Sequence, residues 1–339
     1  MINKKYWHNY PSITTITDNI DGKSNYISFD EVCDQNQAGG SSPKVFVRVR
    51  GSEMKNLYDD VLANENFLTC VDSLIRDNDF SRENFNNFYI SSIVKQISPE
   101  SVTSEVLASR IASLMGVSTA YTEKHCDGDK VISVDFLKGK QQFCTLEDIL
   151  IPGCYVLLFY IGRNQPNIKI YIDALRKSLD DKIPNDYPNK SQTILNAITE
   201  LIRQYIFRVY IINDEDFTPY NIGLVCDEGD FNYSIAPMFD CELSLSASHN
   251  LISSTKDFYP LLRDLEYVFN EYPLVLSRIV NDYMRPSKKE IVDIVKGNIK
   301  SSFKSMLVSN YILKQRKTIN NIFHDLALNS CQEDEFEIE

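Results

Sequence analysis

The spacing of apolar residues predicts strands in the first part of the chain. Several short segments there alternate apolar and polar residues, or are rich in β-branched and aromatic residues. This pattern is typical of strands, because successive side chains of a strand point to opposite faces. The segments are residues 44–49, 87–95 and 131–136. Residues 52–86 between the first two are polar and charged, and we interpret them as an insertion between strands.

A helical repeat replaces the alternation further along the chain. Residues 103–116, TSEVLASRIASLMG, carry an apolar stripe at helical spacing, a Ser or Thr to cap the start, and Gly116 where a C-terminal cap is expected. Another stripe predicts a helix from Ser191 to Val209. Beyond residue 240 the pattern predicts helices as far as Phe323. Their expected boundaries are Pro260, Pro273 and Pro286.

A predicted hairpin lies between the two helical regions. Residues 222–226 and 232–236 are short strand-like runs, and Asp-Glu-Gly-Asp between them is a turn signal. Pro237 has no N–H for a sheet and would end the second strand. A hairpin would bring together the residues at its two ends, Asn221 and Asp240.

Composition and charge limit the classes of function. The chain has 339 residues, a mass of 39.0 kDa and 43% hydrophobic residues, which predicts a globular protein of two lobes or domains. A net charge of −12 and a pI near 4.9 argue against direct nucleic-acid binding and against an anionic membrane surface. The N-terminus lacks the apolar core of a signal peptide, and no apolar run of about 18 residues occurs. We therefore expect a cytoplasmic protein, while the sequence leaves export open.

Three polar residues around the hairpin have the spacing that phosphoryl transfer requires. A carboxylate must orient the substrate hydroxyl and accept its proton, and amide and carboxylate oxygens hold the magnesium ions. Asp216 is the candidate base, and Asn221 and Asp240 are the candidate metal ligands. The alternative is that these residues flank an ordinary hairpin, since loops use Asp and Asn for turns.

The first part of the chain contains candidate nucleotide contacts. A loop with Gly39, Gly40, Ser41 and Ser42 precedes the first strand, and glycines let main-chain N–H groups approach phosphates. The alternative is a plain surface turn. Lys95 ends the second strand, where it can reach phosphates or simply terminate an exposed strand. Glu105, in the expected first turn of the following helix, either pairs with Lys95 or complements the helix dipole.

Taken in order, these segments resemble the HipA-like kinases, and among them the compact, stand-alone, cell-translocating type. The similar motifs are Gly39-Gly40-x-x-Pro-Lys44, Ile-Val-Lys95, Ser-Glu105 through Met-Gly-Val, Asp216 with Asn221, and Ala-Pro-Met-Phe-Asp240-Cys. The resemblance implies an α+β, two-lobed, protein-kinase-like fold related to the phosphatidylinositol kinases. It implies a β-rich N-lobe at 1–138 and a mainly helical C-lobe at 139–330. Independently of the resemblance, the acidic composition of residues 331–339 predicts a disordered tail.

The resemblance also implies a function. It implies that ATP and Mg²⁺ are cofactors and that phosphate is transferred to Ser or Thr of a protein, with autophosphorylation at Ser41 or Ser42 as a regulatory option. Catalytic roles fall to Asp216, Lys95 and Glu105, and metal binding to Asn221 and Asp240. Nucleotide binding falls to Gly39, Gly40, Ser41, Ser42, Lys44, Lys95, Asp135 and Phe136, and the segment after Phe136 is the expected inter-lobe linker, where adenine would meet the main chain.

The catalytic loop departs from the usual family pattern. The family usually carries Asn two residues before the catalytic Asp and His two residues after it, whereas this chain has Asp214 and Thr218. These departures keep an alternative function open, that of a catalytically weak nucleotide-binding or interaction protein. A third alternative, a kinase of a lipid or small molecule, follows only from fold kinship. The sequence identifies neither the protein substrate nor the oligomeric state.

Overall fold

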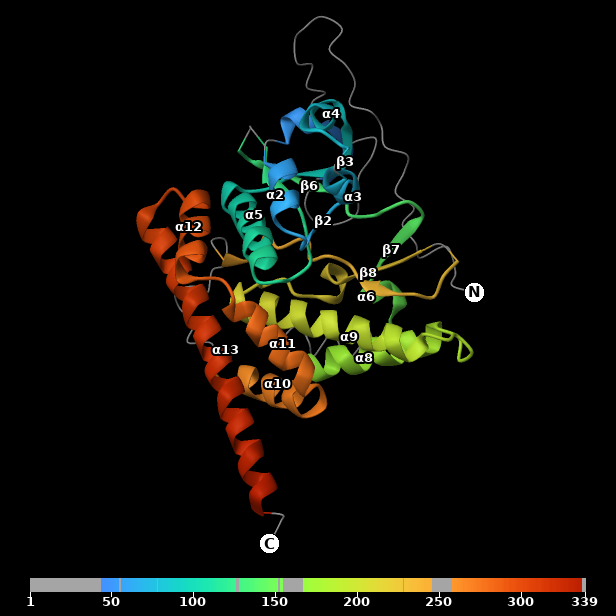
Figure 1. Ribbon diagram of the computed structural model, residues 1–339, viewed down its shortest axis with the longest axis vertical. Helices are drawn as coiled ribbons and strands as arrows, with labels where there is room; N and C mark the ends of the chain where they lie inside the picture. Colours follow the sequence, from blue (N-terminus) through green and yellow to red (C-terminus); the bar gives the residue numbers. More distant parts are fainter. Residues whose placement is uncertain are drawn as a thin grey trace, which may run out of the picture.

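A computed structural model of the chain describes residues 44–336, except 55, 78, 126–127, 152, 155–166, 228 and 246–257. The predicted glycine-rich loop with Gly39, Gly40, Ser41 and Ser42 lies outside the described residues, as does the side chain of Lys44. Figure 1 shows a β-rich first part above a mainly helical second part. The predicted α+β class, with strands first and helices second, is confirmed.

A four-stranded antiparallel sheet forms the centre of the first part. Its strands, in spatial order, are β1 (Lys44–Arg50), β3 (Tyr89–Gln96), β6 (Lys130–Val134) and β5 (Thr122–Lys124). The register places Lys44 of β1 opposite Lys95 of β3. Side chains alternate along β3, so that Ile90 and Val94 pack into the core beneath the sheet. The three segments predicted as strands thus form three neighbouring strands of one sheet, with β1 at its edge.

Short helices fill the predicted insertion between β1 and β3. They are α2 (Leu57–Ala63), α3 (Asp72–Arg76) and α4 (Arg82–Asn87). Leu57 and Val61 of α2 are buried in the same hydrophobic cluster as Phe85 of α4. A two-stranded parallel sheet joins β2 (Phe67–Leu68) to β4 (Thr119–Ala120). The insertion therefore contributes half of this core.

Helix α5 (Pro99–Leu114) begins earlier than the sequence predicts. The side chain of Ser98 caps it by accepting a hydrogen bond from the Ser101 amide at 3.1 Å, and Pro99 occupies the first position. The prediction that Glu105 lies in the first turn is wrong, because a Ser-Pro start four residues upstream outcompetes Thr103 as the beginning. Gly116 follows the helix with a φ of +76°, as a C-terminal cap requires.

A three-stranded antiparallel sheet lies below the first part. Its order is β7 (Gln141–Thr145), β8 (Gly223–Asp227) and β9 (Ser234–Ile235). The segment expected to be a linker after Phe136 instead contains β7 and the short helix α6 (Leu146–Ile149). Its strand forms because Phe143 and Cys144 are buried when β7 pairs with the hairpin.

Helices make up most of the second part. They are α8 (Ile168–Lys182), α9 (Lys190–Ile206), α10 (Phe258–Glu271), α11 (Pro273–Met284), α12 (Lys288–Asn298) and α13 (Ser302–Phe336). The proline boundaries hold: Pro260 lies in the first turn of α10, Pro273 starts α11 and Pro286 precedes α12. Helix α12 packs on α5 and so joins the two parts.

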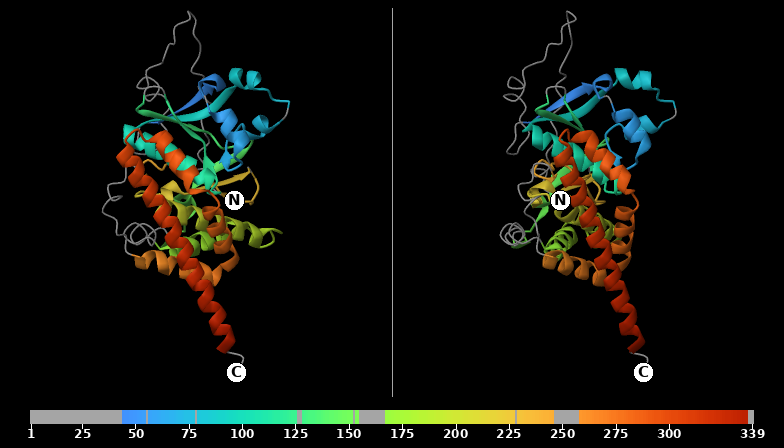
Figure 2. Two further views of the ribbon diagram at one scale, coloured as in Figure 1. Left: turned by 60° about the vertical axis from the view of Figure 1, so that its left-hand side comes forward. Right: turned by 90° about the vertical axis from the view of Figure 1, so that its left-hand side faces the viewer.

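The last helix runs along the whole second part. Figure 2 shows α13 extending past the other helices towards the C-terminus. It continues to Phe336, so residues 331–336 are helical where the sequence predicts disorder. These residues contain no Gly or Pro, and Glu and Gln favour helix once a long helix already precedes them. Within the described residues, no helix is long and apolar enough to cross a membrane.

Candidate active site

The predicted hairpin brings together two segments that carry candidate site residues. We call residues 213–221 the catalytic-loop segment and residues 240–245 the metal segment. Strands β8 and β9 pair antiparallel, with Leu224 opposite Ile235. The main-chain carbonyls at the two ends of this hairpin, those of Asn221 and Asp240, both accept hydrogen bonds from Arg208, at 2.6 and 3.1 Å. The predicted meeting of the two hairpin ends is confirmed.

Asp216 and Asn221 form one side of the site. The amide Nδ2 of Asn221 donates to the Asp216 carboxylate and to the Asp216 carbonyl, both at 2.9 Å. The Asp216 amide in turn donates to the Asp214 carboxylate at 3.1 Å. Partial burial and the neighbouring charge of Asp214 raise the pKa of Asp216, and Asn221 opposes that rise. A carboxylate held in this way is suited to orient a hydroxyl and accept its proton.

Lys95 stands at the centre of the site. Its ammonium contacts both oxygens of Glu105 at 2.9 and 3.0 Å, and an oxygen of Asp240 at 2.9 Å. The predicted Lys95–Glu105 ion pair is thus present, and Asp240 joins it from 145 positions along the chain. Burial alone would lower the pKa of Lys95, but the Asp240 and Glu105 carboxylates outweigh burial and raise it. Lys95 therefore carries a positive charge at neutral pH.

Oxygen donors suited to a divalent cation surround Asp240. Carboxylate oxygens of Glu105, Asp240 and Glu242 lie within 4.8 Å of one another. Mg²⁺ prefers carboxylate and amide oxygens, so the donor set fits the predicted ion. Glu242 is an addition that the sequence reasoning missed, although it stands two residues after the predicted ligand Asp240.

Asp135 and Phe136 lie at the exit from β6, with different surroundings. The amide of Asp135 donates to Ser91 at 2.9 Å and its carbonyl accepts from Cys70 at 2.6 Å. These main-chain groups are therefore used within the protein, which disfavours an adenine contact through the main chain of Asp135. Phe136 instead joins Phe143 and Phe239 in a cluster with ring centroids 5.5–6.3 Å apart. An apolar wall thus lies next to Asp240, the residue after Phe239.

Arg208 is a second member of the site that sequence reasoning missed. It lies in a turn of π-helix, Phe207–Ile211, that continues α9, and its side chain is fully buried. Its guanidinium contacts the Asp214 carboxylate at 2.6 and 2.7 Å. The available signal was an arginine in the middle of the apolar run Ile-Phe-Arg-Val-Tyr-Ile-Ile, because a buried charge requires a partner.

Unusual backbone conformations gather at the same place. Among the described residues, those other than glycine with positive φ are Asn213 at 51°, Asp240 at 58° and Leu245 at 43°. All lie on the catalytic-loop segment or the metal segment. The Leu245 amide donates to the Ile212 carbonyl at 2.9 Å and ties these two segments together. Such conformations persist where surrounding contacts fix them, and they cluster at functional sites.

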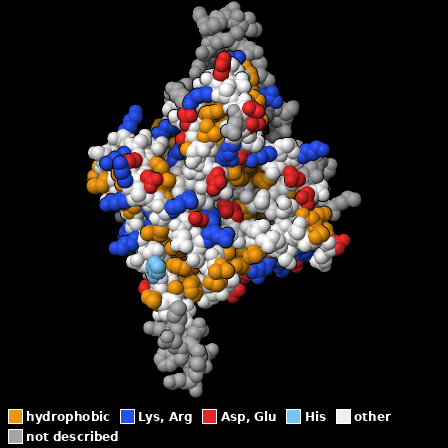
Figure 3. All heavy atoms as spheres, viewed as in Figure 1, with side chains coloured by type: hydrophobic (Ala, Val, Ile, Leu, Met, Phe, Trp, Pro, Cys, Tyr) orange, Lys and Arg blue, Asp and Glu red, His pale blue; other side chains and the backbone are white. Residues whose placement is uncertain are grey.

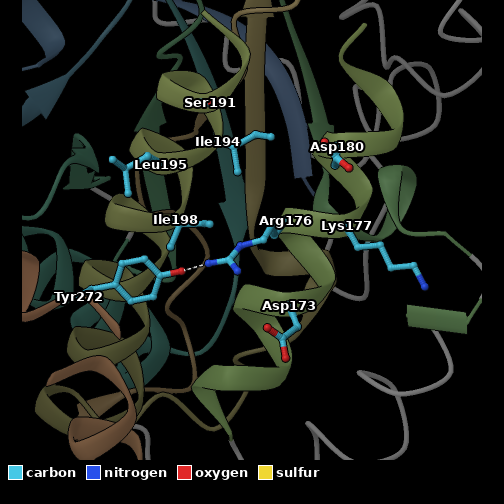
Figure 4. Close-up of a pocket in the computed structure, with 9 residues that line it drawn as sticks. All are labelled: Asp173, Arg176, Lys177, Asp180, Ser191, Ile194, Leu195, Ile198 and Tyr272. Atoms are coloured by element: carbon cyan, nitrogen blue, oxygen red, sulfur yellow. Dashed lines mark hydrogen bonds between the residues drawn. The ribbon is translucent and has the colours of Figure 1, made fainter. Parts of the chain in front are cut away.

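A separate groove lies away from this chemistry, between α8, α9 and the start of α11. It has a volume of about 580 Å³. Figure 4 shows Ile194, Leu195 and Ile198 on one side, and Arg176 reaching across to the hydroxyl of Tyr272. Charged residues of both signs from α8 line its other side. None of the predicted site residues lines this groove.

The face seen in Figure 3 carries charges of both signs. Lys and Arg side chains lie beside Asp and Glu across it, and apolar side chains gather in its lower part, over α10 and α11. Tyr259 of α10 and Leu274 of α11 are 80% and 83% exposed. The negative net charge is therefore not concentrated on this face.

No family model and no curated protein matches the sequence. The solved structures that match include the Helicobacter pylori proinflammatory kinase CtkA, with a TM-score of 0.49 and 14% identity over 71% of this chain and 92% of that chain. They also include HipA from the toxin–antitoxin complex of HipA, HipB and operator DNA of Shewanella oneidensis MR-1. That TM-score is 0.42, with 11% identity over 85% of this chain and 65% of that chain.

Proposed function

We propose that this chain transfers a phosphoryl group from ATP, with Mg²⁺, to a Ser or Thr of a protein. The observation that supports this proposal is the convergence of Lys95, Glu105, Asp216, Asn221 and Asp240 on one site. These residue types supply what phosphoryl transfer needs, namely a charge for the phosphates, a base for the hydroxyl and oxygens for the metal. We take residues 1–138 and 139–330 as the two lobes between which the nucleotide binds.

Each residue has a role in the proposed reaction. Lys95, held by Glu105, would bind the phosphates of ATP, and Asp216 would orient the hydroxyl of the substrate and accept its proton. Asp240 and Asn221 would hold Mg²⁺, with Glu242 beside them. The ion, when bound, would neutralise charge that develops on the transferred phosphoryl group. The oxygen of the substrate then forms a bond to the γ-phosphorus, and ADP leaves.

The alternative that the chain binds nucleotide with little catalysis draws on one observation. Thr218 stands where the similar family usually has a histidine. The two functions differ in turnover rather than in binding. Cytoplasmic localisation and a protein substrate stay predictions.

Labelled ATP distinguishes these functions. Purified protein is incubated with γ-labelled ATP and Mg²⁺, alone and with a general protein substrate, and the label is followed into protein, lipid or small molecule. We expect label on Ser or Thr, including the peptide that contains Ser41 and Ser42. The matched control is Asp216→Asn, which removes the base and changes the side chain little in size. Nucleotide binding without transfer of label by the unmodified protein would favour the alternative.

A further inference from the structure

We propose that Arg208 is a positioning residue that sets the distance between the catalytic loop and the metal segment. The catalytic consequence of this inference rests on the proposed function. Its structural claim, that Arg208 holds the two segments in place, rests only on the contacts of Arg208. Its hydrogen bonds to described residues go to the Asp214 carboxylate and to the main-chain carbonyls of Asn221 and Asp240, and none goes to Lys95, Glu105 or the Asp216 carboxylate. It therefore acts through Asp214 and through the main chain of the segments that carry the catalytic groups.

The guanidinium of Arg208 joins segments that are far apart in the sequence. Its Nε and Nη2 contact the carboxylate of Asp214, its Nη1 donates to the carbonyl of Asn221 at 2.6 Å, and its Nη2 donates to the carbonyl of Asp240 at 3.1 Å. The ring of Phe217 lies against it, with its centroid 5.3 Å from the guanidinium carbon. One side chain thus contacts residues on both sides of the candidate base and at both candidate metal ligands.

Only an arginine has the donors for this arrangement. The guanidinium is planar and offers five N–H donors on three nitrogens in a fixed fork, whereas the ammonium of a lysine offers three donors on a single nitrogen, fewer than the four contacts that Arg208 makes. The charge also requires the carboxylate of Asp214, since both side chains of this pair are 0% exposed. Asp214, at the position where the similar family usually has Asn, is therefore the counter-charge for Arg208. The same carboxylate accepts the Asp216 amide and so transmits the position of Arg208 to the candidate base.

The local backbone supports this interpretation independently. Arg208 lies in a π-helical turn, where the Ile212 amide donates to the Phe207 carbonyl at 3.0 Å, and such turns are frequent at functional sites. Asp240, one of the acceptors of Arg208, has the unfavourable φ of 58°. A conformation of this kind needs contacts that hold it, and the bond from Arg208 to the Asp240 carbonyl is one of them.

Arg203 provides a matched control on the same helix. It is 8% exposed, its Nη1 contacts the carboxylate of Asp282 at 2.6 Å, and the same nitrogen donates to the Gly116 carbonyl at 3.1 Å. It therefore also pairs a nearly buried guanidinium with an aspartate and a main-chain carbonyl. Its partners, however, lie outside the catalytic-loop and metal segments.

The test compares Arg208→Lys with Arg203→Lys in the full chain. Hydrogen–deuterium exchange is measured on peptides that cover residues 213–221 and 240–245, and kcat, KM for ATP and the Mg²⁺ dependence are measured on the same samples. For Arg208→Lys we expect faster exchange in both peptides, roughly a 10- to 100-fold lower kcat, and a smaller change in KM. For Arg203→Lys we expect unchanged exchange in these peptides and an unchanged kcat.

The exchange measurement separates failure of this inference from failure of the proposed function. If Arg208→Lys leaves exchange at residues 240–245 unaltered, or if Arg203→Lys accelerates exchange there equally, Arg208 does not position the metal segment. If the unmodified protein transfers no phosphate, the proposed function fails, and the exchange result still decides the positioning role. Should Arg208→Lys not fold, the double variant Arg208→Met/Asp214→Asn removes both charges and takes its place, with the same expected acceleration in both peptides.

Discussion

Asp216 is the residue on which the proposed chemistry depends most directly. Replacing it with Asn keeps the size of the side chain and removes the base, so we expect a loss of about 10²- to 10⁴-fold in kcat with little loss of stability.

Because burial and Asp214 raise the pKa of Asp216, the base is protonated at a higher pH than an ordinary aspartate. The rate should therefore fall as the pH is lowered through this raised pKa. A pH–rate profile of the unmodified protein measures this fall in rate. A fall centred at the ordinary pKa of an aspartate would contradict the assignment of Asp216 as the base.

The Arg208–Asp214 pair makes a separate prediction about stability. Asp214→Asn leaves a fully buried guanidinium without a counter-charge. We expect a loss of about 3–5 kcal/mol in the free energy of unfolding. The double variant Arg208→Met/Asp214→Asn should lose less than Asp214→Asn alone, because no unpaired charge remains. Urea unfolding of both variants tests this, and equal losses would mean that charge pairing is not the cause.

At the residue scale, the sequence identifies residues with chemical roles better than residues that hold them in place. Lys95, Glu105, Asp216, Asn221 and Asp240 follow from motifs, and the structure brings them together. Arg208 follows from no motif, because its partners are two main-chain carbonyls and a carboxylate whose positions only the folded chain defines. Local spacing contains no information about such contacts.

At the element scale, helix α5 positions Glu105, and its start can be tested. Ser98 caps the helix, while Thr103, the predicted start, lies inside it and bonds back to the Pro99 carbonyl at 2.9 Å. We expect Ser98→Ala to lower the free energy of unfolding by about 1 kcal/mol, because it removes a cap. Thr103→Ala serves as the matched control and should change stability by less than about 0.5 kcal/mol. A reversed order of the two losses in urea unfolding would place the start of the helix at Thr103.

The boundaries of elements were less predictable than their types. Strands β1, β3 and β6 and the β8–β9 hairpin occur where alternation and turn residues predict them. Strand β7 was missed because its burial comes from pairing with β8, about 80 residues away, rather than from its own pattern. The helical end of α13 was missed because acidic composition favours disorder only where no preceding helix is present to be extended.

At the scale of the whole molecule, Lys95 links the first part of the chain to the metal segment of the second part. The sequence predicts both parts, but their relative placement depends on contacts such as Lys95 with Asp240 and α12 with α5. These contacts join residues that are 145 or more positions apart in the chain. The candidate site therefore exists only when both parts are folded and packed together, and a ligand bound there should stabilise both.

This coupling predicts how Mg²⁺ and nucleotide affect the unfolding temperature. A ligand that binds only the folded state stabilises it by about 2.7 kcal/mol at a concentration of 100 times its Kd, which for a chain of this size amounts to a few degrees. In the structure the Asp240 carboxylate contacts Lys95 at 2.9 Å, so Mg²⁺ must share or replace this contact, whereas nucleotide alone need not. We expect a non-hydrolysable ATP analogue to raise the unfolding temperature more with Mg²⁺ than without it.

In Asp240→Asn this difference between the two unfolding temperatures should disappear, while in Asp227→Asn, at the exposed end of β8, it should persist. Differential scanning fluorimetry with and without a chelator measures these shifts, and a Mg²⁺-dependent shift that survives in folded Asp240→Asn would remove Asp240 from the metal site.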